Sequence, residues 1–360
     1  MTLVRVGTRS SALALWQANY VVSRLRELAP DARIQIVEVA SAGDEVTDVP
    51  LRMVAHGHAD GGAARDPWNT AGVPGAGTVT HGHADGGATR DPSNTAGVPE
   101  ASTGTGFFTA TLERALLDGH VDVAVHSYKD LPVEVTTGLT VAAVPPRGPV
   151  ADALCARRPG ETVESLPRGA IVGTCSARRE AQLRALRPDL DIQPLHGNVP
   201  TRLHALDAGK FDAVVLAKAG LVRLGLENAI TQVLPMRSML PAPAQGAMAV
   251  QIRSGERELA PLLAGLNDAE ARRAATAERT LLHALGGGCS APVGAWARRD
   301  GARFTLTAGV FALDGSRVVR TTVMHEDPNT LGMAAARQLI QQGAADVLAP
   351  ILAARTGVGA

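Results

Sequence analysis

The segment AIVGTCSARREAQLRAL, residues 170–186, consists of a short apolar strand pattern that leads directly into a helical pattern over 177–187. The N-terminus repeats this succession, with a strand at 3–6 before a helix at about 11–28 that Ser10 or Ser11 can cap. Further strands are expected at 33–39, 121–125 and 212–217, and further helices at 106–119 and 201–208. This alternation predicts an α/β fold with parallel sheets.

Two stretches rich in proline and glycine interrupt the alternation, VPPRGPV at 144–150 and LPAPAQG at 240–246. Such stretches are typical of crossings between domains. Two crossings indicate a chain that leaves a first domain, builds a second and returns. We therefore expect a first α/β domain over 1–145 with 247–265, a second over 150–241, and a small C-terminal α+β domain over 268–360. The third would hold a helix at about 269–285, strands at 304–310 and 316–324, and a helix at about 330–348.

Residues 55–103 form an insert that contains a tandem duplication. HGHADGGAARDPWNTAGVP at 56–74 recurs as HGHADGGATRDPSNTAGVP at 81–99. Such a composition buries too little apolar surface to offset the entropy of ordering, so we expect a flexible loop. Metal binding by the HxH pairs is the alternative, but no carboxylate or thiol stands at a fixed offset from them, and we expect no metal site.

Composition and charge exclude several classes of protein. The 35 basic and 35 acidic residues give a net charge of zero, whereas a nucleic-acid-binding protein normally has a basic excess. No apolar run approaches the roughly 18 residues of a membrane span, and the N-terminus lacks a signal-peptide pattern, so we expect a cytoplasmic protein without a membrane partner. Three scattered cysteines are too few for a disulfide framework.

Charged side chains follow the predicted strands, where parallel sheets place their ligands. Lys129 and Asp130 come after the strand at 121–125; a solvated turn with a local Lys–Asp pair is the alternative interpretation. Arg178 and Arg179 stand in the first turn of a helix, where positive charge opposes the helix dipole. A bound anion would explain this placement.

Three further arginines lie near strand ends: Arg9, Arg202 and Arg223. Because a guanidinium can bind a carboxylate through two parallel hydrogen bonds, the arginines together indicate a polyanionic small molecule. Cys289 lies in the glycine-flanked loop GGGCSAP, where a bulky group could approach closely. It could also be a small buried side chain.

These motifs, in this order, resemble those of the porphobilinogen deaminase family. The matching stretches are GTRSSALALWQ (7–17), HSYKDLP (126–132), GTCSARREAQL (173–183), HGNVPTRL (196–203), GLVRLGL (220–226), PAPAQGAMAV (241–250) and GGGCSAPVG (286–294). The resemblance implies two α/β domains similar to the halves of periplasmic binding proteins, followed by a small C-terminal domain. It also implies a monomer.

The resemblance further implies a hydroxymethylbilane synthase of tetrapyrrole (haem) biosynthesis. Such an enzyme joins four porphobilinogen molecules head to tail and releases ammonia at each step. Its dipyrromethane cofactor would be held by a thioether to Cys289. Asp130 would be the catalytic carboxylate, because loss of ammonia leaves a cationic pyrrole that a carboxylate stabilises. The implied contacts to the carboxylates of cofactor and substrate are Arg9, Ser11, Ser127, Lys129, Thr174, Ser176, Arg178, Arg179, Asn198, Arg202, Arg223 and Gln245.

The sequence also departs from the family pattern. His196 stands where the family often has arginine, Thr105 and Ala110 stand where it often has lysine, and Ala42 replaces another arginine. Together with the insert, these changes leave open an impaired copy of the enzyme. A second alternative is a two-lobed protein that binds a small anion without catalysis, which would need neither Cys289 nor Asp130.

Overall fold

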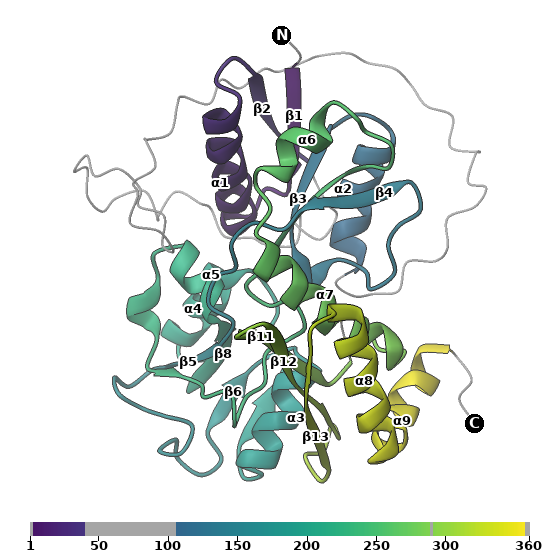
Figure 1. Ribbon diagram of the computed structural model, residues 1–360. Coiled ribbons are helices and arrows are strands. Elements are labelled where there is room, and N and C mark those ends of the chain that lie inside the picture. Colours follow the sequence, from purple (N-terminus) through teal and green to yellow (C-terminus); the bar gives the residue numbers. More distant parts are fainter. Residues whose placement is uncertain (1–2, 40–105, 289–290, 357–360) are drawn as a thin grey trace, which may run out of the picture.

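The computed structural model describes residues 3–39, 106–288 and 291–356, which form three sheets and their covering helices (Figure 1). The predicted insert at 55–103 and Cys289 lie outside the described residues. None of the helices in the described part of the chain is long and apolar enough to cross a membrane.

The first sheet has the strand order β2-β1-β3-β10-β4. Its strands are β1 (Leu3–Thr8), β2 (Arg33–Glu38), β3 (Val123–Ser127), β4 (Leu139–Ala143) and β10 (Met248–Arg253). Its helices are α1 (Ala12–Leu28), α2 (Gly106–Leu117) and α6 (Leu259–Ala264). Successive side chains of β3 point to opposite faces of the sheet, so Val123 and Val125 pack on the side of α1, whereas Ala124 packs with α2. Both faces of the sheet are therefore covered, as the apolar strands require.

The second sheet has the order β7-β6-β8-β5-β9. Its strands are β5 (Asp152–Ala156), β6 (Ile171–Gly173), β7 (Asp191–Gln193), β8 (Ala213–Ala217) and β9 (Gln232–Val233). The associated helices are α3 (Ala177–Leu186), α4 (Val199–Asp207), α5 (Lys218–Arg223) and the short η3 (Glu227–Ala229). The expected α/β fold class is confirmed.

The sheets are mixed, which corrects the expectation of purely parallel strands. β10 runs antiparallel to β3 and β4, and β5 runs antiparallel to β8 and β9. Each is the strand that follows a crossing, and each begins opposite the carboxyl end of a parallel strand: Met248 pairs with Ser127, and Asp152 with Ala217. A chain that enters a sheet at that edge must run against its neighbours. Both crossings therefore lie at the edges where parallel sheets place their ligands.

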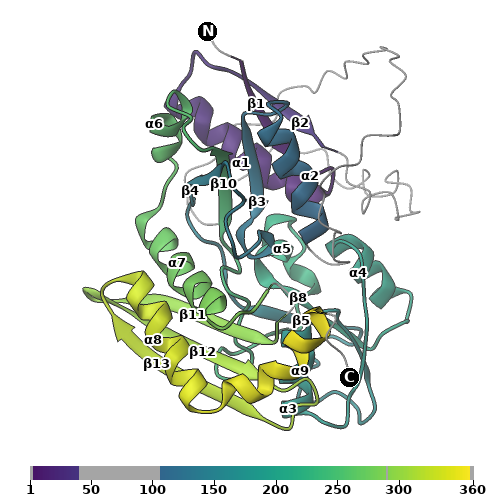
Figure 2. The same cartoon turned by 90° about the vertical axis from the view of Figure 1, so that its right-hand side faces the viewer.

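The third sheet is an antiparallel meander of β11 (Val293–Asp300), β12 (Arg303–Phe311) and β13 (Val318–His325). Helices α7 (Ala269–Ala284), α8 (Pro328–Gln341) and α9 (Ala344–Thr356) accompany it. The single helix predicted at 330–348 is wrong: Gly343 has φ +89°, a left-handed conformation that ends one helix before the next begins. Figure 2 shows α7 between the first sheet and the third.

Candidate active site

The turn after β3 carries the predicted catalytic carboxylate. β3 ends at Ser127, whose Oγ accepts a hydrogen bond from Gln17 Nε2 of α1 at 2.9 Å. The next three residues form the short 3₁₀ helix η2 (Tyr128–Asp130), and the side chains of Lys129 and Asp130 are half-buried. Neither forms an ion pair within 4.0 Å in the part of the chain that the structure describes. The alternative of a simple Lys–Asp surface pair is therefore not what this turn contains.

Arg202 belongs to α4, one of the helices associated with the second sheet. Its Nε donates to the Gly197 carbonyl at 2.7 Å, and its Nη2 lies 3.6 Å from Cys175 Sγ. Burial lowers the pKa of Arg202, while the charge of Asp130 acts in the opposite direction. Asp130 and Arg202 are thus within electrostatic reach of each other although they come from different sheets.

Lys129 is a strongly perturbed cation in this region. Its pKa is lowered to about 8, chiefly by burial; the charges of Arg178 and Arg179 act in the same direction, and those of Asp130 and Asp152 oppose the change. A lysine with this environment gains stabilisation when an additional anion approaches. The local electrostatics therefore favour a carboxylate ligand at this position.

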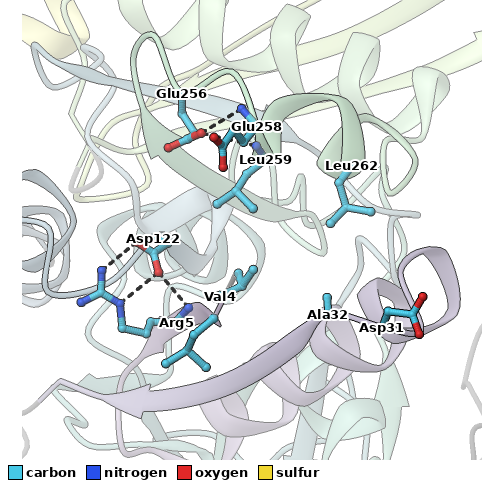
Figure 3. A pocket seen from close by; sticks show the side chains of 10 residues that line it. Val4, Arg5, Asp31, Ala32, Asp122, Glu256, Glu258, Leu259 and Leu262 are labelled. Atoms are coloured by element: carbon cyan, nitrogen blue, oxygen red, sulfur yellow. Dashed lines mark hydrogen bonds and ion pairs between the residues drawn. The ribbon is translucent and has the colours of Figure 1, made fainter. Parts of the chain in front are cut away.

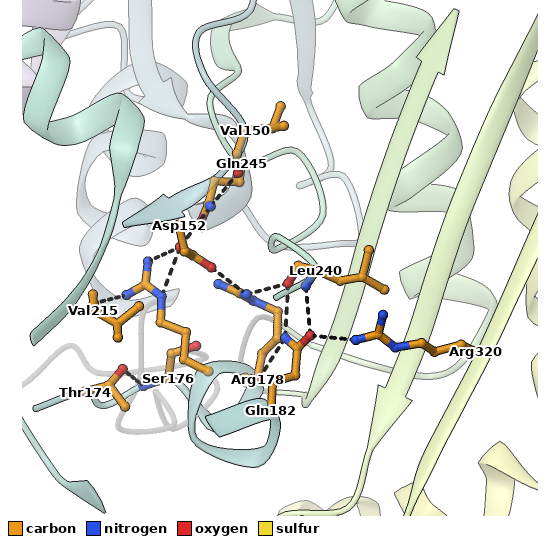
Figure 4. Close-up of polar contacts among 11 residues, drawn as sticks. Val150, Asp152, Thr174, Ser176, Arg178, Gln182, Val215, Leu240, Gln245 and Arg320 are labelled. Atoms are coloured by element: carbon orange, nitrogen blue, oxygen red, sulfur yellow. Dashed lines mark hydrogen bonds and ion pairs between the residues drawn. The ribbon is translucent and has the colours of Figure 1, made fainter. Parts of the chain in front are cut away.

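On the side of the site formed by the second sheet, Asp152 at the start of β5 is a buried carboxylate that contacts several polar side chains (Figure 4). Arg178 Nη1 lies 2.7 Å from Asp152 Oδ2, and Arg179 Nη2 lies 2.7 Å from Oδ1. Asp152 also accepts a hydrogen bond from Gln245 Nε2 at 3.0 Å. Burial alone would raise the pKa of Asp152, but the charges of both arginines outweigh burial and hold the pKa well below its ordinary range.

These contacts bear on two sequence-based inferences. Arg178 and Arg179 share one carboxylate of the chain itself, Asp152, which explains part of their placement and neutralises one of their two charges. Gln245 is fully buried, and its amide nitrogen also donates to the Val150 carbonyl at 2.8 Å. Contact of Gln245 with a ligand carboxylate stays a prediction. Contact of the two arginines with a ligand stays a prediction.

Two of the predicted hydroxyl and amide residues, Ser11 and Asn198, cap the starts of helices. Ser11 caps α1 as expected, since its Oγ accepts from Ala14 N at 3.3 Å. Asn198 caps α4 by accepting from Thr201 N at 2.9 Å. Ser176 occupies the cap position of α3, but its side chain makes no capping bond. Instead, its backbone N–H donates to Thr174 Oγ1 at 3.2 Å.

The two remaining predicted arginines flank this region. Arg9 follows β1, and its charge helps to lower the pKa of the neighbouring His126, which burial brings to about 4. Arg223 is buried at the end of α5, where Nη2 donates to the Gly246 carbonyl at 2.7 Å. Its guanidinium lies 5.5 Å from the centre of the Trp16 ring. Their contacts with a ligand stay predictions.

The charges around η2 fit an acidic ligand. Lys129, Arg178, Arg179 and Arg202 interact there with two carboxylates, Asp130 and Asp152, which leaves an excess of positive charge. Burial disfavours this excess unless further negative charge is supplied. A dipyrromethane with its acetate and propionate groups would supply it.

A pocket of about 500 Å³ lies elsewhere, at the opposite end of β1 from Arg9 (Figure 3). It is lined by apolar side chains and by acidic ones that include Asp122 and Glu256. Arg5 already pairs with Asp122 at 2.8 Å. This pocket contains none of the predicted site residues.

Three residues escaped the sequence-based prediction, although each left a local signal. Asp152 is an acid at the start of the apolar strand DALCA. Glu278 lies on the apolar face of α7, four residues after Ala274 and three before Leu281, and is fully buried. Arg279 follows it and contacts the turn of Asp130. A charged residue within an apolar pattern indicates a buried partner, but the pattern does not identify that partner.

Family models match most of the chain. The model described as "Porphobilinogen deaminase, dipyromethane cofactor binding domain" matches residues 4–59 and 91–261, and the model of the porphobilinogen deaminase C-terminal domain matches 272–341. The chain belongs to the porphobilinogen deaminase family. The residues left unmatched between 59 and 91 fall inside the predicted insert.

Porphobilinogen deaminases of several bacteria are similar to this chain over nearly its full length. The protein of Brevibacillus brevis is 38% identical, with 97% of each chain covered. That of Mycolicibacterium gilvum is 40% identical, with 96% of this chain and 98% of the relative covered. The resemblance to porphobilinogen deaminases inferred from the motifs is confirmed.

Solved structures of binding proteins are more distantly similar to this porphobilinogen deaminase. The methionine binding protein MetQ has a TM-score of 0.40 and 11% identity, covering 77% of this chain and 94% of that one. The VFT2 domain of Bordetella pertussis BvgS has a TM-score of 0.36 and 13% identity, covering 73% and 86%. The fold assignment rests on the sheet topology rather than on these scores.

Proposed function

We propose that this porphobilinogen deaminase joins four porphobilinogen molecules head to tail, with release of ammonia, to give hydroxymethylbilane. The supporting observations are that Lys129 and Asp130 share the turn after β3 and that the charge of Asp130 also acts on Arg202 of α4, in a region with excess positive charge. The family match to a cofactor-binding domain supports the same reaction. The family match supports this reaction rather than an anion-binding protein without catalysis, and the experiment below also distinguishes an impaired copy.

In this proposal, cations bind the carboxylates of cofactor and substrate. Lys129 and Arg202 make the direct contacts with the ligand carboxylates, and Arg9 and Arg223 extend the positively charged region. Arg178 and Arg179, which are paired with Asp152, add further positive charge nearby. Cys289 forms the thioether to dipyrromethane. When bound, the cofactor supplies the pyrrole to which the first substrate is joined.

Asp130 is the proposed catalytic residue. Ammonia leaves the aminomethyl group of porphobilinogen as a new carbon–carbon bond becomes possible, and the remaining pyrrole carries positive charge. A fixed carboxylate beside the pyrrole N–H stabilises that charge and can accept the proton that the ring later loses. In the described residues no cation lies within ion-pair distance of Asp130. In this proposal, its carboxylate therefore interacts with the positive charge of the ligand.

We also propose the three-domain division 1–145 with 247–265, 150–241 and 268–360. All strands of each sheet come from within one of these ranges. Because one chain supplies Lys129, Asp130 and Arg202, the site needs no second copy, which supports a monomer. We propose that this monomer acts in the cytoplasm.

The mass of the intact purified protein tests the proposed function. We expect the wild-type chain, after incubation with porphobilinogen, to exceed its sequence mass by one dipyrromethane, and Cys289→Ala to have the bare mass. Cys175 is an exposed thiol beside Arg202, so Cys175→Ala is the matched control and should retain the added mass. A wild-type protein with the bare mass would favour the anion-binding alternative, and a loaded protein without turnover would favour the impaired copy.

A further inference from the structure

Arg279 of α7 reaches across to the turn that carries Asp130. Its Nη1 donates to the carbonyl oxygens of Tyr128 at 3.3 Å and Leu131 at 3.2 Å. Its Nη2 donates to the carbonyl oxygens of Pro132 and Val133, the latter at 3.3 Å. One guanidinium therefore contacts the backbone on both sides of Asp130.

The same guanidinium also lies over the ring of Tyr128, at 4.6 Å from its centre. A cation over an aromatic face adds attraction, and a planar guanidinium holds several acceptors in fixed directions. Tyr128 N in turn donates to the carbonyl of Ala247, the residue directly after the second crossing, at 3.0 Å. An ammonium group could not reproduce this arrangement, because it offers no planar fork.

The neighbouring residue of α7 fixes the helix from which Arg279 extends. Glu278 is fully buried and forms two hydrogen bonds of 2.8 Å with Arg147. It also accepts from Ala244 N at 2.6 Å and from Ala297 N at 2.7 Å. This turn of α7 is thus anchored to both crossings and to the third sheet, so Arg279 extends from a rigid support.

We propose that Arg279 is a positioning residue for the reaction: it holds the backbone of the turn so that the Asp130 carboxylate meets the reacting pyrrole. The inference rests on the proposed function, in which Asp130 is the catalytic carboxylate. Arg279 acts through the backbone and touches neither substrate nor cofactor. Because a displacement of about 1 Å at a reacting group can cost on the order of 10²-fold in rate, loss of this contact should affect kcat.

The test compares Arg279→Met and Arg279→Lys with wild type, with rates expressed per cofactor-loaded molecule. We expect Arg279→Met to lower kcat by roughly 10- to 100-fold while KM changes by less than about threefold. Arg279→Lys keeps the charge without the planar fork, so its kcat should fall between the two. A purely structural role would lower the Tm or the loaded fraction and leave kcat per loaded molecule unchanged.

Arg273→Met is the matched control on the same helix. Arg273 also lies over an aromatic ring, 4.9 Å from the centre of Phe304, and donates to the Glu326 carbonyl, but both partners belong to the third unit. We expect wild-type kcat for this variant. Equal losses of kcat in Arg273→Met and Arg279→Met would overturn the inference, as would a wild-type kcat in Arg279→Met.

Tyr128→Leu serves if Arg279→Met does not fold, because it removes the ring and leaves the backbone carbonyls in place. It should lower kcat in the same direction with little change in KM, and an unchanged kcat would contradict the proposal.

Asp130→Ala, assayed alongside, distinguishes a failure of the positioning role of Arg279 from a failure of the catalytic role of Asp130. If Asp130→Ala is inactive and the Arg279 variants have wild-type kcat, only the positioning role fails; an active Asp130→Ala refutes the catalytic role of Asp130, on which the inference rests, and a wild-type protein without turnover refutes the proposed function.

Discussion

Arg147 and Glu278 form a two-point ion pair in which Nη1–Oε1 and Nη2–Oε2 are both 2.8 Å long. Arg147 belongs to the first crossing, and Glu278 also accepts the backbone N–H of Ala244 in the second. Ala244 has φ +60°, which is unfavourable for a residue with a side chain. The buried carboxylate of Glu278 therefore connects both crossings. It also accepts a hydrogen bond from Ala244, the strained residue of the second crossing.

We expect Glu278→Ala to lower the free energy of unfolding by about 3–5 kcal/mol, because it leaves the Arg147 charge buried without its partner. Urea denaturation measures the change. Glu278→Gln should be less harmful, since an amide oxygen can still accept one of the backbone N–H groups.

Glu27→Gln is the matched control, because Glu27 forms an ion pair of 2.8 Å with Arg24 on the exposed surface of α1. Exposed pairs contribute about 0–1 kcal/mol, so this variant should be close to wild type. Similar decreases in the free energy of unfolding for Glu278→Ala and Glu27→Gln would show that burial of the Arg147–Glu278 pair does not increase its contribution to stability.

Asp130→Ala should lower the turnover number by roughly 10²- to 10³-fold, because removal of one electrostatic partner of a developing charge typically has that effect. Its Tm should stay near that of wild type, since no described cation forms an ion pair with Asp130. Asp118→Ala is the control: this exposed carboxylate pairs with Arg114 at 3.5 Å on the surface. Turnover by Asp130→Ala at the rate of Asp118→Ala would refute the catalytic role.

Lys129 should make cofactor loading dependent on pH. Its pKa of about 8 means that it is charged below pH 8 and progressively neutral above it, chiefly because of its burial. We expect the cofactor-free protein to load more slowly with porphobilinogen as the pH rises from 7 to 9, as followed by intact mass.

The variant Lys129→Arg is the control for this titration, because a guanidinium stays charged over the whole range and loading should then proceed at a nearly constant rate. Cys175 lies beside Arg202, and Cys175→Ala should still show the decline, because that variant keeps Lys129. A decline that persists in Lys129→Arg would assign the effect to another group.

His126 should make the fold less stable in mild acid. Burial lowers its pKa to about 4, with the charge of Arg9 acting in the same direction and a hydrogen bond with Gln251 opposing it. The unfolded chain binds a proton near pH 6.5, so this contribution to stability is complete above pH 6.5 and is lost as the pH falls toward 4. At roughly 1.4 kcal/mol per pKa unit, the loss amounts to about 3 kcal/mol.

The variant His126→Gln removes this titration. Its free energy of unfolding, measured in urea between pH 7.5 and 4.5, should vary less with pH than that of wild type. Parallel curves for the two proteins would show that His126 does not titrate differently in the folded and unfolded states.

Local patterns in the sequence were sufficient for much of the fold. Local sequence patterns predicted α1, α3 and β8, and the cap of α1 was narrowed to Ser10 or Ser11, of which Ser11 is the cap, because these features depend on neighbours a few residues away. The position of Asp130 directly after a strand was also readable, since a strand end is a local feature. The two crossings could be predicted from their prolines and glycines, but the antiparallel direction of β5 and β10 could not.

The partners of the buried charges were decided only by the tertiary structure. Asp152 meets Arg178 across 26 residues of chain, and Arg147 meets Glu278 across 131. Arg279 reaches the carbonyl of Tyr128 across 151 residues. Helix and strand patterns arise from interactions between near neighbours, whereas these contacts exist only once the crossings have brought separate sheets together. The sequence by itself determined which charges lie at the strand ends; the packing of the three units decided which of them neutralise one another and which face a ligand.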